Sequence, residues 1–414
     1  MCPQEGLIPV STPAGGDGVA NRTDPGPGGR TAVVAHPGAE LYGSDRVLLE
    51  SVAALVERGW RTVVVLPGTG PLCGALEDAG AQVEVLDVPV LRKAAMSPRG
   101  LLALSARTLL SLPALVRLLR RERPAVLYVS TLTVPVWLLA GALRRVPVVV
   151  HVHEAEASAP APVRLALNAP LLLARRVVVN SDFSLGVLTR AVPGLARRSE
   201  VVLNGVPGPA AVVPPREELT GPVRLLYVGR LSSRKGVDVA VEATAELRRR
   251  GLDAELDVVG SAFPGYEWFV EQLDRAAAAP ELAGRVRRHG FSDAVWDHLA
   301  SADVLLVPSR LDEPFGNTAV EGRLAARPVV ASATSGLLEA VAGSPSCRSV
   351  TPGSGVAVAD AVAELVDAWP EVREQALRDA LLAAERHAPA GYRERLAEQV
   401  ARAAGVPSSA VAAR

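Results

Sequence analysis

The chain has 414 residues, more than one ordinary hydrophobic core contains, which favours two domains. Its 44 basic and 44 acidic residues leave no net charge, so nucleic acid is not expected as a partner. Three scattered cysteines predict neither a disulfide framework nor a metal site. Because no signal sequence and no run of 18 uncharged apolar residues is found, we expect a cytoplasmic protein.

The first residues differ in composition from everything that follows. Residues 1–30 contain seven glycines and five prolines and show no periodic apolar pattern, which predicts a disordered tail. From residue 31 onward, β-branched runs alternate with helix-like segments such as 44–58 and 112–121. This alternation is typical of a parallel sheet covered on both faces. Its strands are predicted at 31–35, 62–66, 83–86, 125–129, 147–152 and 176–179.

A second series of the same kind follows residues 206–222, a Pro- and Gly-rich segment that we interpret as an interdomain linker. The predicted domains span 31–205 and 223–389, and the amphipathic helix 390–404 is expected to pack back on the first domain. The fold class is therefore α/β, with two Rossmann-like, doubly wound parallel-sheet domains facing across a cleft. The second set of strands is predicted at 223–228, 255–259, 285–289, 303–307 and 328–331.

The segment 309–321, SRLDEPFGNTAVE, combines two carboxylates with a predicted helix start. Glu313 precedes a helix that opens near Gly316, and Glu321 lies one to two turns into that helix. A helix start presents unpaired N–H groups and a partial positive charge. Carboxylates that accept hydrogen bonds and amides that donate them suit a polyhydroxylated ligand. A surface loop followed by a solvated glutamate is the simpler interpretation of this segment alone.

A second candidate site follows the predicted strand 223–228. Arg230 and Lys235 lie in a loop after Gly229 and before a predicted helix. Two cations at the end of a strand fit a diphosphate through charge-assisted hydrogen bonds, although a solvated basic loop is an equal alternative. Lys235 is one of only two lysines in a chain that otherwise uses arginine. The chain contains no Asp-x-Asp, so basic side chains would have to neutralise the phosphates unaided.

Two segments of the first domain complete the set of candidates. The strand 147–152 ends in His151-Val-His153-Glu154, where His151 is expected to be structural and His153 to meet a ligand hydroxyl. Gly43 precedes a helix start and would let the backbone approach a phosphate or an acceptor. The alternative there is a helix capped by Ser44 or Asp45.

Taken in order, these segments resemble the retaining glycosyltransferases of family 4, of glycosyltransferase group 1 type, whose two Rossmann-like domains adopt the GT-B arrangement. The resemblance runs from about residue 36 to the C-terminus. The matching segments are ELYGSDR at 40–46, HVHE at 151–154, VVNS at 178–181, LNGV at 203–206, YVGRLSSRKGVD at 227–238, VVGS at 258–261, HGF at 289–291, the Glu313–Glu321 block and SGLLEAV at 335–341.

The resemblance implies how a nucleotide-sugar donor would be held. Arg230 and Lys235 would bind the diphosphate, and Glu321 would bind the ribose hydroxyls. The second domain would thus bind the donor, with a UDP- or GDP-sugar favoured. The sugar would be held by Glu313 and by the backbone amides near Phe315, Gly316 and Asn317.

The resemblance also implies the reaction. His153 would face the transferred sugar, and Gly43 would lie over the phosphates. Transfer would retain the anomeric configuration and would require no metal ion or other cofactor. The acceptor would be a glycan, a lipid-linked molecule or a small molecule, bound on the side of the first domain.

Two positions depart from the family pattern, which often has two glycines at each of them. This chain has Tyr42-Gly43 at the first and Ser335-Gly336 at the second. Either difference could change backbone freedom and sugar choice.

Residues 91–123 contain seven arginines and one lysine against the single acidic residue Glu122. Leu112, Leu115, Val116 and Leu119 fall on one helical face. A basic amphipathic helix of this kind suits an anionic membrane surface, and the protein could then be peripheral on the inner face of a membrane. The alternative is an ordinary helix that covers the sheet and has a solvated basic edge.

Two other functions compete with glycosyl transfer. A non-hydrolysing sugar-nucleotide epimerase would share the two-domain architecture and would turn over its donor without an acceptor. A catalytically idle sugar-nucleotide-binding protein would form no product. The sequence does not identify the base, the sugar, the acceptor or the oligomeric state.

Overall fold

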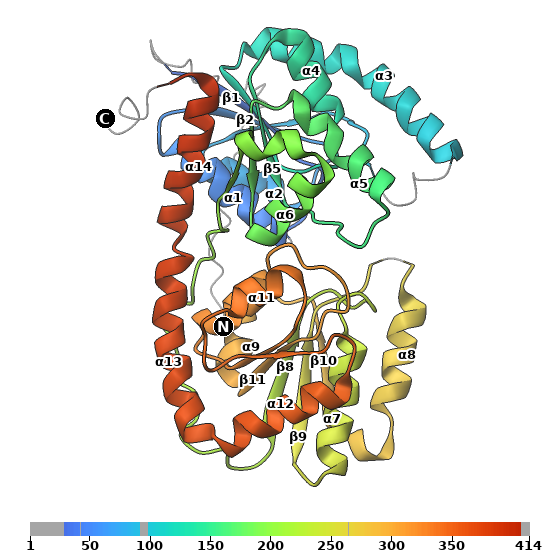
Figure 1. The fold of residues 1–414 in the computed structure, drawn as a ribbon, viewed down its shortest axis with the longest axis vertical. Coiled ribbons are helices and arrows are strands. Elements are labelled where there is room, and N and C mark those ends of the chain that lie inside the picture. The colour runs from blue at the N-terminus through green and yellow to red at the C-terminus, as the bar shows by residue number, and fades with distance from the viewer. Residues whose placement is uncertain (1–28, 42, 92–97, 264, 407–414) are drawn as a thin grey trace, which may run out of the picture.

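The computed structural model describes residues 29–41, 43–91, 98–263 and 265–406. Nearly all of the predicted tail therefore lies outside the described residues. The described chain forms two parallel sheets, one in each domain, with helices on both faces (Figure 1). The predicted fold class is confirmed.

The first sheet has the strand order β3-β2-β1-β4-β5-β6-β7, and every pairing is parallel. Its strands are apolar because both faces are covered. In β1, Val33 and Ala35 contribute to one core while Ala32 and Val34 contribute to the other. The strands are β1 (Thr31–Ala35), β2 (Arg61–Leu66), β3 (Gln82–Val85), β4 (Val126–Val129), β5 (Val148–Val152), β6 (Arg176–Val179) and β7 (Ser199–Val201).

Two groups of helices cover this sheet. The core on one face includes residues of α3 (Pro98–Glu122), α4 (Val136–Arg144) and the 3₁₀ segment η2 (Ala169–Leu173). The core on the other face includes residues of α1 (Gly43–Val56), α2 (Pro71–Asp78) and the C-terminal helix α14 (Pro389–Ala404). The domain also contains α5 (Ala161–Asn168), α6 (Asp182–Ala191) and η3 (Pro193–Arg198).

The second sheet has the order β10-β9-β8-β11-β12-β13 and is also parallel throughout. Its strands are β8 (Val223–Val228), β9 (Ala254–Val259), β10 (Val286–Gly290), β11 (Val304–Val307), β12 (Val329–Ser332) and β13 (Arg348–Val350). Its helices are α7 (Val237–Arg249), α8 (Glu267–Ala277), η4 (Pro280–Leu282), α9 (Val295–Ser301), α10 (Asn317–Leu324), α11 (Ser335–Val341), α12 (Gly355–Asp367) and α13 (Trp369–Arg386).

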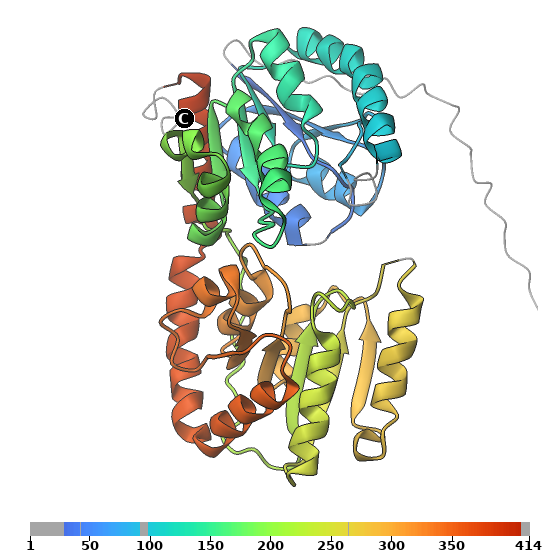
Figure 2. The same ribbon diagram turned by 45° about the vertical axis from the view of Figure 1, so that its right-hand side comes forward.

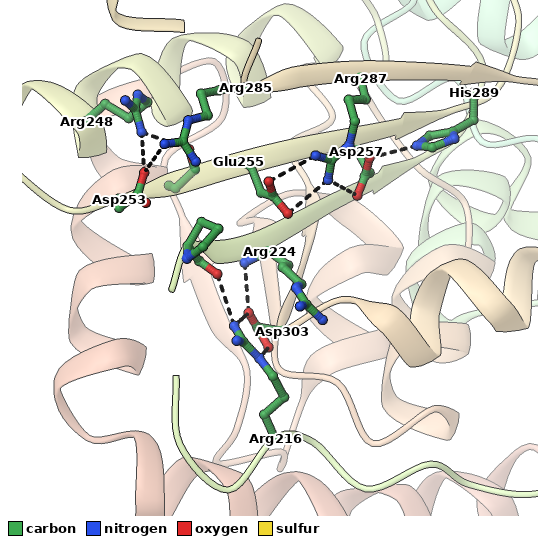
Figure 3. A network of polar contacts seen from close by, with 12 residues as sticks. Arg216, Arg224, Arg248, Asp253, Glu255, Asp257, Arg285, Arg287, His289 and Asp303 are labelled. Atoms are coloured by element: carbon green, nitrogen blue, oxygen red, sulfur yellow. Dashed lines mark hydrogen bonds and ion pairs between the residues drawn. The ribbon is translucent and has the colours of Figure 1, made fainter. Parts of the chain in front are cut away.

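Ion pairs support the exposed side of the second sheet and the linker (Figure 3). Arg287 of β10 pairs with Glu255 and Asp257 of β9 at 2.9 Å each, across the outermost strand pair. Arg216 pairs with the buried Asp303 at 2.5 Å, and Asp303 also accepts from the backbone N–H of Arg224. The segment before β8 is therefore anchored to both central strands of the second sheet.

The two C-terminal helices connect the domains. α13 and α14 follow one another along one side of the molecule, beside the second domain and then the first (Figures 1 and 2). Leu396 and Val400 of α14 are buried in the core of the first domain. Tyr392 donates or accepts a 2.6 Å hydrogen bond with Ser51 of α1. Residues 202–222 and this helix pair are the two connections between the domains.

The eleven predicted strands all form, with bounds shifted by at most a residue or two, but β7 and β13 were not predicted. Both are three-residue edge strands, Ser-Glu-Val and Arg-Ser-Val, which are too short for an apolar period to be recognised. The predicted helix 112–121 is the second half of the longer α3. α1 begins at Gly43, so Ser44 and Asp45 lie inside the helix and do not cap it.

Candidate functional site

A pocket lies between the two domains, at the strand ends where the order of the second sheet reverses. Such a switch point is where doubly wound sheets bind ligands. The pocket is open to solvent and encloses about 670 Å³ with that solvent included. Gly43 and Arg46 line it from the first domain, and Arg230, Asn317 and Glu321 line it from the second.

Two glycines make this pocket possible at the ends of β8 and β9. Gly229 has φ 155° and Gly260 has φ 138°, in the region that favours glycine. A Cβ atom on Gly260 would lie 1.9 Å from the carbonyl oxygen of Gly229. A side chain at Gly260 would therefore displace the loop that holds Arg230.

Arg230 is held by its backbone and by an aromatic ring. Its carbonyl oxygen accepts a 2.9 Å hydrogen bond from the Tyr227 hydroxyl, and its guanidinium lies 3.6 Å from the ring centroid of Phe263. Such a cation–π contact fixes a guanidinium without neutralising its charge. Arg230 therefore brings a positive charge to the lining of the pocket.

Lys235 and Glu313, predicted separately, form one ion pair. The Lys235 Nζ lies 2.7 Å from Glu313 Oε1, which also accepts a 3.1 Å hydrogen bond from Ser309. Glu313 is 8% exposed, and its backbone N–H donates to the Ser335 hydroxyl at 2.7 Å. The turn after Lys235 requires glycine at position 236. Gly236 has φ 71°, and a Cβ atom on it would lie 2.0 Å from the Pro308 carbonyl oxygen.

The helix start predicted near Gly316 is present. Gly316 is the N-cap of α10 with φ 94°, and a Cβ on it would lie 2.7 Å from a Leu337 methyl group. Phe315 is buried, and its ring meets that of His387 edge-on at 5.6 Å. The Phe315 side chain therefore belongs to the core, and only its backbone could contact a ligand.

Gly43 and Asn317 join the two domains. A Cβ on Gly43 would lie 3.1 Å from the side-chain nitrogen of Asn317, so α1 approaches α10 closely at this point. Asn317 Oδ1 accepts a 3.1 Å hydrogen bond from Asn204, which belongs to the segment between the domains. Gly43 thus lines the pocket from the first domain.

Glu321 lies in the pocket, and its carboxylate accepts no hydrogen bond from another described residue. Burial raises its pKa to about 7, and the positive charge of Arg46 opposes the rise. The half-buried carboxylate is an acceptor that the protein does not satisfy, which suits a ligand hydroxyl.

His153 lies at the end of β5 in the first domain. Its Nε2 is 3.4 Å from the Ser130 hydroxyl, and its ring is 4.0 Å from that of His151. Burial lowers the pKa of His153 to about 3, with a further contribution from His36. The imidazole is therefore neutral and can exchange hydrogen bonds with a hydroxyl.

Several residues near the site were not predicted. Arg46 lines the pocket, Ser335 binds the Glu313 backbone, and Glu339 of α11 crosses to the first domain. Glu339 accepts hydrogen bonds from the backbone N–H groups of Asp182 and Phe183 at 2.9 and 2.6 Å, at the start of α6. Arg46 and Glu339 lie in segments that matched the family pattern, so a charged residue in a matching segment was the available signal.

The predicted site residues thus form three groups. Gly43, Arg230, Asn317 and Glu321 share one pocket, Lys235 and Glu313 form a pair, and His153 lies at the end of β5. Phe315 and Gly316 belong to none of these groups and lie at the start of α10. Among residues 29–41, 43–91, 98–263 and 265–406, no three His, Cys, Asp or Glu side chains gather as a metal site. Their functional roles remain predictions.

Two family models match the chain, one in each domain. Residues 42–207 match the model described as "Glycosyltransferase Family 4", and residues 222–402 match that described as "Glycosyl transferases group 1". Each of the two domains therefore matches a glycosyltransferase family model.

Among curated proteins, the glycogen synthase of Mycobacterium tuberculosis is 34% identical over 177 residues, which are 42% of this chain and 41% of that protein. The D-inositol 3-phosphate glycosyltransferase of Kineococcus radiotolerans is 33% identical over 45% of this chain and 41% of its own. The matches thus span about two fifths of these relatives.

Solved structures share the fold over nearly the whole chain. HepE of Anabaena, in complex with UDP-glucose, has a TM-score of 0.74 at 21% identity, over 90% of this chain and 99% of that one. A glycosyltransferase from Rickettsia africae has a TM-score of 0.73 at 18% identity, over 91% and 99%.

Proposed function

We propose that this protein transfers a sugar from a nucleoside-diphosphate sugar to an acceptor hydroxyl, with retention of anomeric configuration and without an obligatory metal ion. The observation that carries this proposal is the pocket between the domains. It combines two arginines from opposite domains with an unsatisfied carboxylate, Glu321. The kinds of activity named for the relatives agree with it.

The site offers separate partners for each part of a donor. Arg230 and Lys235 supply positive charge for the diphosphate, and Glu321 supplies an acceptor for the ribose hydroxyls. Lys235 holds Glu313 at the start of α10, where backbone N–H groups and a carboxylate meet. A sugar there would find both donors and acceptors. UDP- and GDP-sugars are the favoured donors.

The chemistry of the side chains favours front-face transfer. Lys235 and Ser309 already bind the Glu313 carboxylate, which suits a residue that positions the sugar and not a nucleophile. In the proposed step the bond from the anomeric carbon to the diphosphate breaks, and the acceptor oxygen bonds to that carbon on the same face. The acceptor proton passes to the leaving diphosphate, whose developing charge Arg230 and Lys235 stabilise.

The test is metal-free incubation with UDP-, GDP-, ADP- and dTDP-sugars, followed by thermal shift and by mass spectrometry of released nucleotide. We expect one donor to stabilise the protein. Arg230→Ala and Lys235→Ala should each lower turnover by about 10²–10³-fold. Arg275→Ala, an exposed position on α8, is the matched control. Near-normal turnover of both site variants at saturating donor would refute the proposal.

A non-hydrolysing epimerase is the second candidate because it shares this architecture. Conversion of the donor sugar in the absence of any acceptor would favour it. Donor binding with no product of either kind would favour an idle nucleotide-sugar-binding protein.

A further inference from the structure

The helix α3 is covered over only half of its length. Leu115, Leu118 and Leu119 in its second half are buried in the core of the first domain. In its first half, Leu102, Leu109 and Leu110 are 72%, 68% and 79% exposed. A surface helix of a globular domain normally turns its leucines toward the core. The first half of α3 therefore presents an apolar surface that the fold leaves unused.

The neighbouring elements extend this surface. α3 packs on α4 (Figure 1), α4 packs on η2, and residues of all three belong to the same core. Leu143 of α4 is 57% exposed, and Leu172 and Leu173 of η2 are about half exposed. We call the outward side of α3, α4 and η2 the leucine face. It lies on the side of the sheet opposite α1, α2 and α14.

Basic residues outnumber acidic ones in this region, where Arg107 pairs with Asp87 and Arg121 pairs with Glu84. Between Asp87 and Glu154 the chain has ten basic residues and one acidic residue, Glu122. Glu122 is largely buried and pairs with Arg61 and Arg121. Arg120, Arg144 and Arg145 are exposed and make no ion pair with another described residue. Exposed leucines flanked by arginines complement a surface that is apolar inside and anionic outside.

Length and composition alone would also let one helix cross a bilayer. Within the 21 residues of Leu102–Glu122, a window of 18 residues has a mean hydropathy of 1.5, but only 17% of that window is buried inside the protein. Its second half is fixed to the sheet through Leu115, Leu118 and Leu119, and Pro113 divides the two halves. A helix anchored in this way can lie on a membrane but cannot span it.

We infer that the leucine face docks the first domain on an anionic lipid bilayer. The first half of α3 also forms one wall of a second pocket, through Ala103, Leu104 and Arg107. The opposite wall comes from the ends of β1 and β2, at Gly38 and Thr69, and the carboxylates of Glu40 and Asp87 line the pocket as well. A head group in this pocket would lie beside helix residues that contact lipid. The acceptor is then lipid-borne, a conclusion that rests on the proposed function.

The experiment is flotation of the full chain with two kinds of vesicle, one of pure phosphatidylcholine and one with about a third phosphatidylglycerol. We expect binding to the anionic vesicles only. Leu109→Ser/Leu110→Ser should reduce it by at least about tenfold. Arg144→Glu/Arg145→Glu should reduce it by at least about fivefold for each arginine, since each basic residue near the surface contributes roughly that factor.

Matched variants elsewhere on the protein distinguish binding through the leucine face from non-specific adsorption to vesicles. Leu381 and Leu382 of α13 are another pair of adjacent exposed leucines, at 74% and 55%, so Leu381→Ser/Leu382→Ser should bind vesicles like the wild type. Arg275→Glu on α8 is the charge control. Thermal shift with the donor is unaffected in every variant, because none of these residues lines the pocket between the domains.

Three outcomes would overturn the inference. The first is a wild type that does not float with anionic vesicles, and the second is binding of the leucine and arginine variants equal to that of their controls. The third is a dimer in size-exclusion chromatography that Leu109→Ser/Leu110→Ser dissociates while vesicle binding is absent. The face would then be a contact between two copies. Donor binding tests the transferase proposal separately, so a failure of one does not imply a failure of the other.

Discussion

Ser335 shows how one residue can keep a geometry that usually needs glycine. The family pattern often has glycine at this position, and Ser335 here adopts φ 45°, which costs a non-glycine residue roughly 1–2 kcal/mol. Its hydroxyl accepts from the Glu313 backbone N–H at 2.7 Å. That hydrogen bond contributes about 1 kcal/mol and offsets most of the strain. The departure from the family pattern therefore preserves the position of Glu313.

Glu321 gives the first prediction, on the pH dependence of donor binding. Because burial raises its pKa to about 7, the carboxylate is partly protonated at neutral pH and becomes a full acceptor only above it. The affinity for UDP should rise from pH 6 to pH 8, as the carboxylate ionises. Isothermal titration calorimetry at pH 6, 7 and 8 measures it.

Glu321→Gln is the matched variant, since its amide keeps the volume but does not titrate. We expect about tenfold weaker binding at pH 8 and less dependence on pH. Titration of the nucleotide itself is common to both proteins and cancels in the comparison. If the affinity for UDP depended on pH equally in the two proteins, the prediction that Glu321 binds the ribose would be wrong.

At the scale of elements, helix starts organise the contact between the domains. α10 begins at Gly316 beside the pocket, and α6 begins at Asp182 facing α11. The Glu339 carboxylate accepts from the first two backbone N–H groups of α6, where the helix dipole favours negative charge. Ser181 reaches across as well and donates to the Pro314 carbonyl at 2.5 Å. The first domain thus contacts the loop that follows Glu313.

The second prediction concerns Glu339. Glu339→Ala removes two charge-assisted hydrogen bonds between the domains, so we expect a larger radius of gyration without ligand and a stability loss of about 1–2 kcal/mol. Small-angle scattering and urea unfolding measure these changes. Glu374→Ala on the exposed side of α13 is the control, and a radius of gyration unchanged in both variants would contradict the expectation.

At the scale of the whole molecule, both connections between the domains meet at His387, between α13 and α14. The His387 carbonyl accepts from the Val206 backbone N–H at 3.0 Å, and its buried ring packs on Phe315. Burial lowers the pKa of His387 to about 4, and the charges of Arg323 and Arg386 lower it further, while a backbone contact with Asn204 acts in the opposite direction. A proton here would add a third positive charge to a buried site.

The third prediction follows from that pKa. A histidine whose pKa falls from about 6.5 unfolded to about 4 folded binds protons better when unfolded, so the protein loses stability as the pH falls through this window. Between pH 7 and pH 4.5 the contribution of His387 is about 2 kcal/mol. On acidification from pH 7 to pH 4.5, His387→Asn should therefore lose about 2 kcal/mol less unfolding free energy than the wild type. Urea unfolding at both pH values measures this difference.

His298→Asn is the control for this comparison, because His298 lies near the surface of the second domain on α9. If His387→Asn and His298→Asn lost the same stability on acidification as the wild type, His387 would not be the group that destabilises the connection between the domains.

The sequence by itself determined the two parallel-sheet domains, because buried strands are continuous apolar runs and the linker has its own composition. It also indicated the local chemistry of the candidate site, since Arg230, Lys235, Glu313 and Glu321 follow recognisable strand ends or a helix start.

Only the tertiary structure decided which of these residues meet. The Lys235–Glu313 pair, the approach of Gly43 to Asn317 and the contact of Glu339 with α6 join positions 78, 274 and 157 residues apart. No local period encodes such distances. The exposure of Leu109 and Leu110 is also a tertiary result, because the same apolar pattern is buried in the second half of α3 and open in the first.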